Sequence, residues 1–174
     1  MYQLRKVITN TKTLKQIYYG LIFSHIQYCI SSWASAAPTN LTALDSLHNR
    51  SLRIILKQNR RSHLNPLYFE LKLLKINDMY ILQIGKIMYK IVNKTWAGDY
   101  KLLPIESIHT HYTRHSSSSN FYVQNTNLNS TKNAITIAGP IIWENVPKEL
   151  KRLPFRLFVN QYKMFLINNY DESM

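Results

Sequence analysis

Apolar side chains in the first 95 residues recur every three or four positions, the spacing that places them on one face of a helix. In the segment 77–93 this stripe consists of Tyr80, Ile84, Ile87, Met88 and Ile91. The same spacing predicts helices over 13–23, 24–34, 41–57 and 66–72, after a short helical turn at 4–9. Short connections between helices are typical of an antiparallel helical bundle.

The segment 41–57 separates an apolar face from a basic one. The apolar face, which we expect to be buried, holds Leu41, Leu44, Leu47, Ser51 and Ile55. Arg50, Arg53 and Lys57 project away from it, and the following loop continues with Arg60, Arg61 and His63. The sequence therefore predicts a helix with cations along its outer side.

After residue 95 the pattern changes. Residues 95–133 are polar, and the alternation around Ile135 and Ile137 predicts a small hairpin pairing 121–124 with 134–138, closed by Gly139-Pro140. Two short helical turns follow, and then a last helix over 155–168 that buries Phe158, Tyr162, Phe165 and Leu166. We expect a mainly α chain: a basic bundle over 1–95, and a tail over 96–174 with a loop, a hairpin and a final helix.

Composition limits the class of protein. The single cysteine, Cys29, excludes an internal disulfide and a Cys-rich zinc site, and its apolar neighbours predict a buried thiol. The uncharged run 16–44 is interrupted by polar side chains and by Pro38, so it is too polar for a membrane span. Without a secretory signal at the start, we expect an intracellular protein, nuclear or cytoplasmic and not secreted.

Charge is the first indication of function. The chain carries a formal net charge of +13. Residues 1–95 hold fourteen Lys and Arg against three Asp and Glu, a balance of +11, whereas residues 96–174 reach only +2. Because such an excess repels itself, a polyanion such as RNA or an RNA–DNA duplex is the expected partner. The alternative is a basic surface that only aids solubility.

The basic residues also cluster along the chain. The candidate backbone-binding residues are Arg50, Arg53, Lys57, Arg60 and Arg61, with Lys86 and Lys90 beside the later helix. Arginine offers forked donors that match phosphate oxygens. Tyr112 and Arg114 would suit an unpaired base and its phosphate. A solvated helix face is the alternative interpretation of this set.

Catalytic patterns are missing from the sequence. Nucleotidyl transfer needs carboxylates that hold two metal ions, and no Asp-Asp or Asp-x-Asp pair occurs. His109, His111 and His115, with Glu106, have the donor types for zinc, but they fall in a polar segment and are expected to be ordinary loop histidines. We therefore expect no enzyme activity, no metal, no cofactor and no small-molecule substrate.

A series of short segments follows in a specific order. They are 24–33 (SHIQYCISSW), 44–55 (Leu44, Leu47, Arg50 and Arg53 at three-residue steps, then Ile54-Ile55), 66–68 (PLY), 74–80 (LKINDMY), 88–90 (MYK), 111–114 (HYTR) and 139–147 (GPIIWENVP). In this order they resemble the region downstream of the polymerase palm in reverse transcriptases of jockey-like non-LTR retrotransposons. The resemblance runs from about Leu4 to Tyr170.

The resemblance implies a thumb-like helical bundle followed by the tail of the element, a bundle that packs on the template–primer duplex in the intact RNA-directed DNA polymerase. The chain contains neither the palm aspartates nor the endonuclease of such enzymes, so no catalytic residue carries over. Two other interpretations stay open: a helical protein-interaction module for an acidic partner, and a pseudogene product with no selected role. The sequence does not indicate an oligomeric state.

Overall fold

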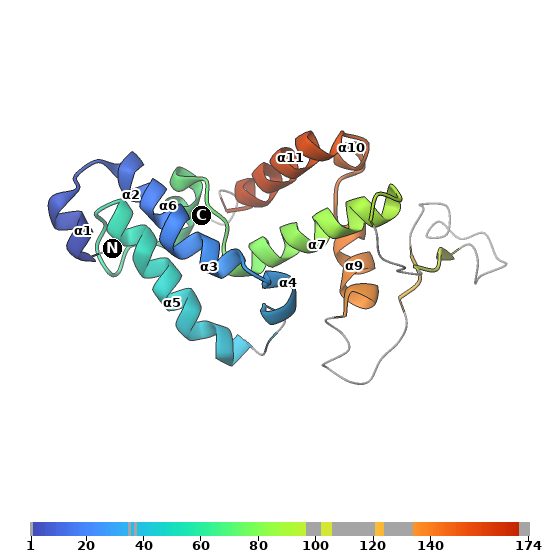
Figure 1. The fold of residues 1–174 in the computed structure, drawn as a ribbon, viewed down its shortest axis with the longest axis horizontal. Coiled ribbons are helices and arrows are strands. Elements are labelled where there is room, and N and C mark those ends of the chain that lie inside the picture. The colour runs from blue at the N-terminus through green and yellow to red at the C-terminus, as the bar shows by residue number, and fades with distance from the viewer. Residues whose placement is uncertain are drawn as a thin grey trace. The chain divides into compact units, whose positions relative to one another are not determined.

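The computed structural model describes residues 2–34, 36, 38–96, 102–105, 121–123 and 134–170. These residues are mainly helical, which confirms the predicted class. Within these ranges no β-strand forms, and a single isolated bridge joins Pro104 to Phe121. In chain order the helices are α1 (Tyr2–Val7), α2 (Thr11–Tyr18), the π-helix η1 (Tyr19–Phe23), α3 (Ser24–Gln27), α4 (Ile30–Trp33), α5 (Pro38–Ile55), α6 (Leu64–Leu71), α7 (Ile76–Val92), α9 (Ile135–Glu144), α10 (Lys148–Lys151) and α11 (Phe155–Asn168) (Figure 1).

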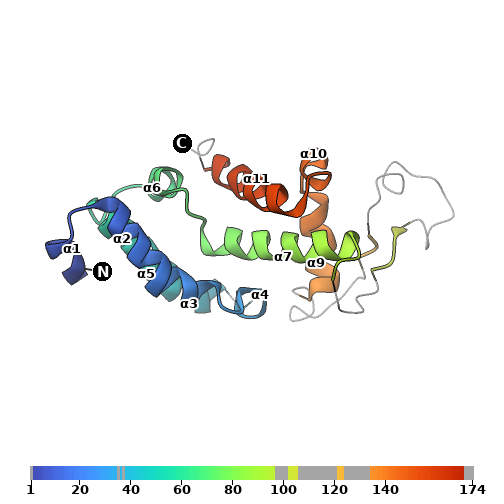
Figure 2. The ribbon, with the colours of Figure 1, turned by 45° about the horizontal axis from the view of Figure 1, so that its top comes forward.

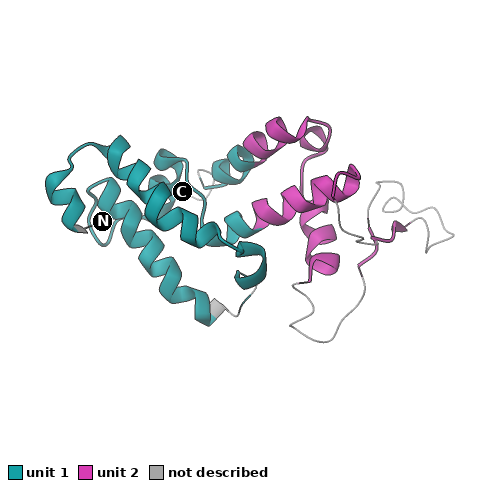
Figure 3. Cartoon of the chain, viewed as in Figure 1, with its two compact units in different colours: residues 1–80, 163–174 teal, residues 81–162 magenta. Residues whose placement is uncertain are grey.

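Contacts between residues divide the chain into two compact units (Figure 3). Unit 1 comprises residues 1–80 and 163–174, and unit 2 comprises residues 81–162. Both α7 and α11 begin in one unit and end in the other. The expected division at residue 95 stays a prediction, because grouping by contact does not test which segments fold alone.

The core of unit 1 forms where α2 lies alongside α5 (Figures 1 and 2). Leu14 and Tyr18 of α2 are fully buried, as are Leu52 and Ile55 of α5. Helix α6 contacts α5 as well and buries Leu67, Tyr68 and Leu71. Asn10 caps α2, since its Oδ1 accepts a hydrogen bond from the Lys12 backbone N–H at 2.8 Å.

Helices α5, α6 and α7 all end in the same way. Lys57, Lys72 and Lys94 follow these helices with φ of 55°, 52° and 55°. After α5, the Lys57 N–H donates to the Ile54 carbonyl and the Gln58 N–H to the Arg53 carbonyl, the pair of bonds that defines a Schellman motif. Glycine usually takes this left-handed position, but a lysine there places a cation near the negative end of the helix dipole.

Unit 2 is built around stacked aromatic rings. The ring of Phe158 in α11 lies 4.7 Å from that of Tyr89 in α7 and 5.9 Å from that of Trp143 in α9, measured between centroids. The Tyr89 hydroxyl donates to the Leu153 carbonyl at 2.6 Å. Gly85 allows α11 to approach α7, because an added Cβ would lie 2.7 Å from Cε1 of Tyr162.

The hairpin prediction is wrong, because residues 135–144 form α9. The alternation of Ile135 and Ile137 imitates a strand, but the buried positions of α9 include Ile137, Pro140 and Trp143, spaced three apart as on a helix face. Pro140 lies inside α9, where proline removes a backbone hydrogen bond at a cost of about 3 kcal/mol. Burial of this apolar face outweighs that cost, and Gly139-Pro140 continues the helix.

The segment 24–34 also differs from its prediction. It forms two short helices, α3 and α4, instead of one, since Tyr28 is extended and Cys29 takes a left-handed φ of 49°. This turn exposes the thiol, so the prediction of a buried Cys29 is wrong. Trp33 closes the turn by donating from Nε1 to the Tyr28 carbonyl at 2.7 Å.

The helix over 155–168 is confirmed, with Phe158, Tyr162 and Leu166 buried, whereas Phe165 is 37% exposed. The stripe of α7 is also confirmed for Tyr80, Ile84, Ile87 and Met88. On α5, Ser51 and Ile55 are buried as expected, but Leu47 is 63% exposed. The prediction for Leu47 is wrong, because the buried stripe of α5 runs through His48 instead.

Candidate nucleic-acid interface

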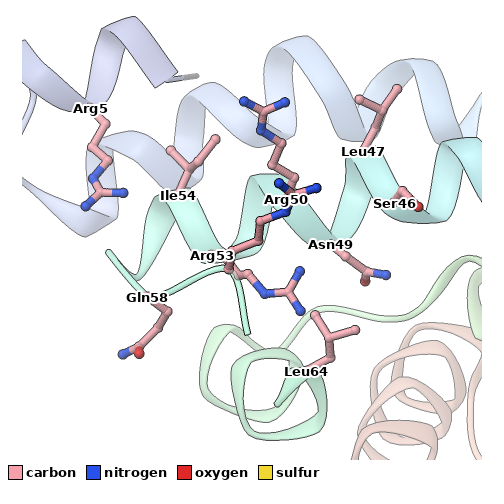
Figure 4. A pocket seen from close by; sticks show the side chains of 10 residues that line it. Arg5, Ser46, Leu47, Asn49, Arg50, Arg53, Ile54, Gln58 and Leu64 are labelled. Carbon is pink, nitrogen blue, oxygen red and sulfur yellow. The ribbon is translucent and has the colours of Figure 1, made fainter. Parts of the chain in front are cut away.

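A pocket of about 600 Å³ opens in unit 1 beside the C-terminal half of α5 (Figure 4). Its walls come from α1, α5, the loop after α5 and the first residue of α6. The lining residues are Arg5, Ser46, Leu47, Asn49, Arg50, Arg53, Ile54, Gln58, Arg60 and Leu64. We call this site the arginine pocket, because four of its ten lining residues are arginines.

Helix α5 supplies most of the pocket through its two stripes. His48, Ser51, Leu52 and Ile55 are buried at the spacing i, i+3, i+4, i+7 and hold the helix in the core. A second set, Leu47, Arg50 and Ile54, recurs on a neighbouring face and lines the pocket. Packing of the first stripe therefore determines where the second one points.

The loop after α5 folds back because of its helix cap. The left-handed turn at Lys57 reverses the chain, and Gln58 and Arg60 then reach the pocket. Arg53 holds this loop, since its Nη2 donates to the Ser62 carbonyl at 3.1 Å. Nε of Arg53 is buried without a hydrogen-bond partner among the described residues. Arg53 therefore stabilises the loop and also lines the pocket.

The pocket concentrates positive charge. Arg5, Arg50, Arg53 and Arg60 line it, and no Asp or Glu does. Within the described part of the chain, no ion pair neutralises any of these guanidinium groups. Guanidinium groups that share a pocket repel one another, so an anion that bridges them gains both attraction and forked hydrogen bonds. This arrangement is suited to phosphate or carboxylate groups.

A buried polar network lies on the core side of α5. The hydroxyl of Tyr68 donates to Oδ1 of Asn49 at 2.7 Å and lies 3.2 Å from Nδ1 of His48, while the Tyr18 hydroxyl lies 2.6 Å from Nε2. Since the Tyr68 proton goes to Asn49, Nδ1 carries the imidazole proton and Nε2 accepts from Tyr18. Burial lowers the pKa of His48 to about 4, so the ring is neutral at pH 7.

The network also fixes one wall of the pocket. Asn49 lines the pocket, and its amide oxygen is held by Tyr68. Burial raises the pKa of both Tyr18 and Tyr68, so these hydroxyls keep their protons and remain hydrogen-bond donors. With the Asn49 amide oxygen bonded to Tyr68, its NH₂ group is the side left for a ligand.

Three of the sequence-predicted basic residues, Arg50, Arg53 and Arg60, come together in the pocket. Lys57 and Arg61 belong to the same segment and are exposed, but they do not line it. Lys57 also has the structural role of the helix cap. Of the five basic residues predicted over 50–61, three therefore line the pocket and two lie outside it.

Lys86 and Lys90 lie on α7 in unit 2. Lys90 Nζ lies over the rings of Phe155 and Trp96, 5.1 and 5.8 Å from the two centroids, an arrangement that stabilises a cation without any anion. Burial, and secondly the charge of Lys90, lowers the pKa of Lys86. Their role in nucleic-acid binding stays a prediction.

Two sets of candidates fall outside the described residues: Tyr112 with Arg114, and His109, His111 and His115. In the described ranges, no group of three or more His, Cys, Asp or Glu side chains comes close enough to bind a metal ion. None of the described helices is both long enough and apolar enough to span a membrane.

Sequence reasoning missed Arg5, Asn49 and Gln58. Arg5 lies in α1, forty-odd residues before Arg50, and no spacing rule connects the two positions. Asn49 and Gln58 are uncharged, so a search for cations passes over them. Arg5 contributed only as part of the charge excess in residues 1–95.

Comparisons of the chain with protein-family models, with curated proteins and with solved structures found no match. The interpretation of the site therefore depends on its own chemistry.

Proposed function

We propose that this chain binds the phosphate backbone of RNA or of an RNA–DNA hybrid, without sequence preference, through the arginine pocket. The observation that carries the proposal is the gathering of Arg5, Arg50, Arg53 and Arg60 around one pocket with no carboxylate in its lining. Contacts to phosphate give affinity without reading bases, because every nucleotide presents the same phosphodiester.

The rest of the chain supports a polyanionic ligand. The charge balance of +11 over residues 1–95 raises the local concentration of anions around the pocket. A small anion would bridge two guanidinium groups, whereas a strand brings several phosphates and so releases several counterions. The long-range field and the local donors thus favour the same class of ligand.

For its origin, we propose a piece of a retrotransposon reverse transcriptase from the region after the palm, with α1 to α7 as a thumb-like bundle. The ordered segments from 24–33 to 139–147 support this origin, and the mainly helical fold is compatible with it. The piece acts by binding and performs no polymerase chemistry itself. We expect it inside the cell, where RNA is available.

Fluorescence anisotropy with a short labelled RNA of mixed sequence tests the proposal. If four arginines each neutralise one phosphate, log K should fall with log salt with a slope of about −2.8 for a single strand. Arg50→Gln should reduce the steepness of that slope by about 0.7, because one contact is lost. Arg156→Gln is the matched control, since Arg156 is exposed on α11 and does not line the pocket.

Affinity that does not change with salt would contradict the electrostatic proposal. Equal effects of Arg50→Gln and Arg156→Gln would show that net charge matters and the pocket does not. Polyglutamate binding as tightly as RNA of equal charge would instead favour an acidic protein as the partner.

A further inference from the structure

The arginine pocket has an apolar wall as well as a charged one. Leu47 and Ile54 of α5 and Leu64 at the start of α6 line it together with the four arginines. Leu47 is 63% exposed, so its side chain is accessible to a ligand in the pocket. A ligand that fills this pocket therefore meets both guanidinium groups and apolar side chains.

A nucleotide has the same two-part chemistry. Its phosphate is an anion that arginine binds with forked donors, and its base is a flat, largely apolar ring with polar edges. The pocket volume of about 600 Å³ lies in the range of cavities that enclose ligands of drug size. A nucleotide is of that size, whereas a double helix presents its bases stacked and covered.

We propose that the arginine pocket takes one unpaired nucleotide of a single strand, with its phosphate and the neighbouring phosphates of the strand on the guanidinium groups and its base against Leu47 and Leu64. This inference rests on the proposed function and makes it more specific. The NH₂ group of Asn49, oriented by Tyr68, and the amide of Gln58 are donors for the acceptor atoms on a base edge or a phosphate.

The preference for single strands follows from the cost of exposing a base. In a duplex, a nucleotide has to unpair and unstack before its base can reach the apolar wall of the pocket, whereas a base of a single strand is already unpaired. Charge alone predicts the opposite order, because duplex DNA carries a higher charge density and releases more counterions per contact. The unpaired-nucleotide inference therefore predicts tighter binding of the single strand, whereas binding by charge alone predicts tighter binding of the duplex.

The experiment measures anisotropy with three probes of equal length at one salt concentration: a mixed-sequence RNA strand, its perfect duplex, and an abasic strand with the same phosphates. The RNA strand should bind more tightly than either of the others, since it alone presents an unpaired base that can bury apolar surface against the leucines. Leu47→Ser should remove most of this advantage, because it takes away apolar surface that the base would bury, and should leave the affinity for the abasic strand unaffected.

Leu21→Ser is the matched control, because Leu21 is 62% exposed, lies in unit 1 and does not line the pocket. It should leave the affinity for all three probes unchanged. Thermal melts of both variants check that each is folded as the parent chain is.

The possible results separate the two proposals. Equal, salt-dependent binding of all three probes would overturn the unpaired-nucleotide inference and leave backbone binding intact. The same loss of affinity in Leu47→Ser and Leu21→Ser would also overturn it. No binding of any probe at low salt would overturn both proposals.

Discussion

Acid should destabilise this protein through one buried imidazole, that of His48. The side chain is 1% exposed, and its two ring nitrogens face the hydroxyls of Tyr18 and Tyr68. Burial lowers the pKa of His48 from 6.5 to about 4. Between these two pH values the unfolded chain binds a proton that the folded chain does not, so the free energy of unfolding falls as the pH falls.

The size of the effect follows from the two pKa values. If His48 were fully protonated in the unfolded chain and neutral in the folded chain, the free energy of unfolding would fall by about 3 kcal/mol between pH 6.5 and pH 4, at about 1.4 kcal/mol per pH unit. Between about pH 7.5 and about pH 5 the loss is about 2 kcal/mol. The contribution of neutral His48 to the free energy of unfolding is fully present above its pKa in the unfolded chain, 6.5. It is lost progressively as the pH falls from there to the pKa in the folded chain, about 4.

Urea unfolding followed by circular dichroism at these two pH values measures the loss. The variant His48→Gln keeps a donor and an acceptor for Tyr18 and Tyr68 but does not titrate. Burial also raises the pKa of Asp45 and of Asp78, and these groups act in the opposite direction. They are present in both proteins, so the difference between the two pH dependences isolates His48.

We expect the parent chain to lose about 2 kcal/mol more than His48→Gln on going from about pH 7.5 to about pH 5. An equal loss in both proteins would refute the reasoning, because it would mean that the folded chain accepts the proton on His48 without cost. A shift in the urea m-value with pH would show instead that the unfolded state had changed.

The remaining predictions concern packing and are read from the free energy of unfolding in urea. Gly85→Ala should lower it by about 1–2 kcal/mol, because overpacking against Tyr162 costs more than the gain in helix propensity. Gly20→Ala should raise the free energy of unfolding by up to about 1 kcal/mol, because an added Cβ there meets no other atom. If both glycine substitutions changed the free energy of unfolding in the same direction, the packing of Tyr162 against Gly85 would be contradicted. Trp143→Ala should cost about 3–5 kcal/mol. Ile141→Ala, exposed on the same helix, should stay within about 0.5 kcal/mol, and similar losses would contradict the assigned burial.

The helical class and the bounds of α7 and α11 could be predicted from the sequence, whereas α5 begins three residues earlier and ends two residues earlier than predicted. The segment predicted over 155–168 is α11 to the residue, and the segment predicted over 77–93 is α7 within one residue at each end. Spacing of apolar residues determines which side chains share a face, and this information is local. The basic character of residues 50–61 was also visible, because charge does not depend on folding.

Which face of a helix is covered, and which distant residues meet, depends on how the helices pack against one another. Leu47 and His48 are neighbours in α5, yet the leucine is exposed and the histidine is buried, because Tyr18 and Tyr68 offer its ring two hydroxyls. Arg5 joins Arg50 at the pocket only because α1 contacts α5. Local patterns set the elements, whereas the pairing of helices far apart in sequence builds the site.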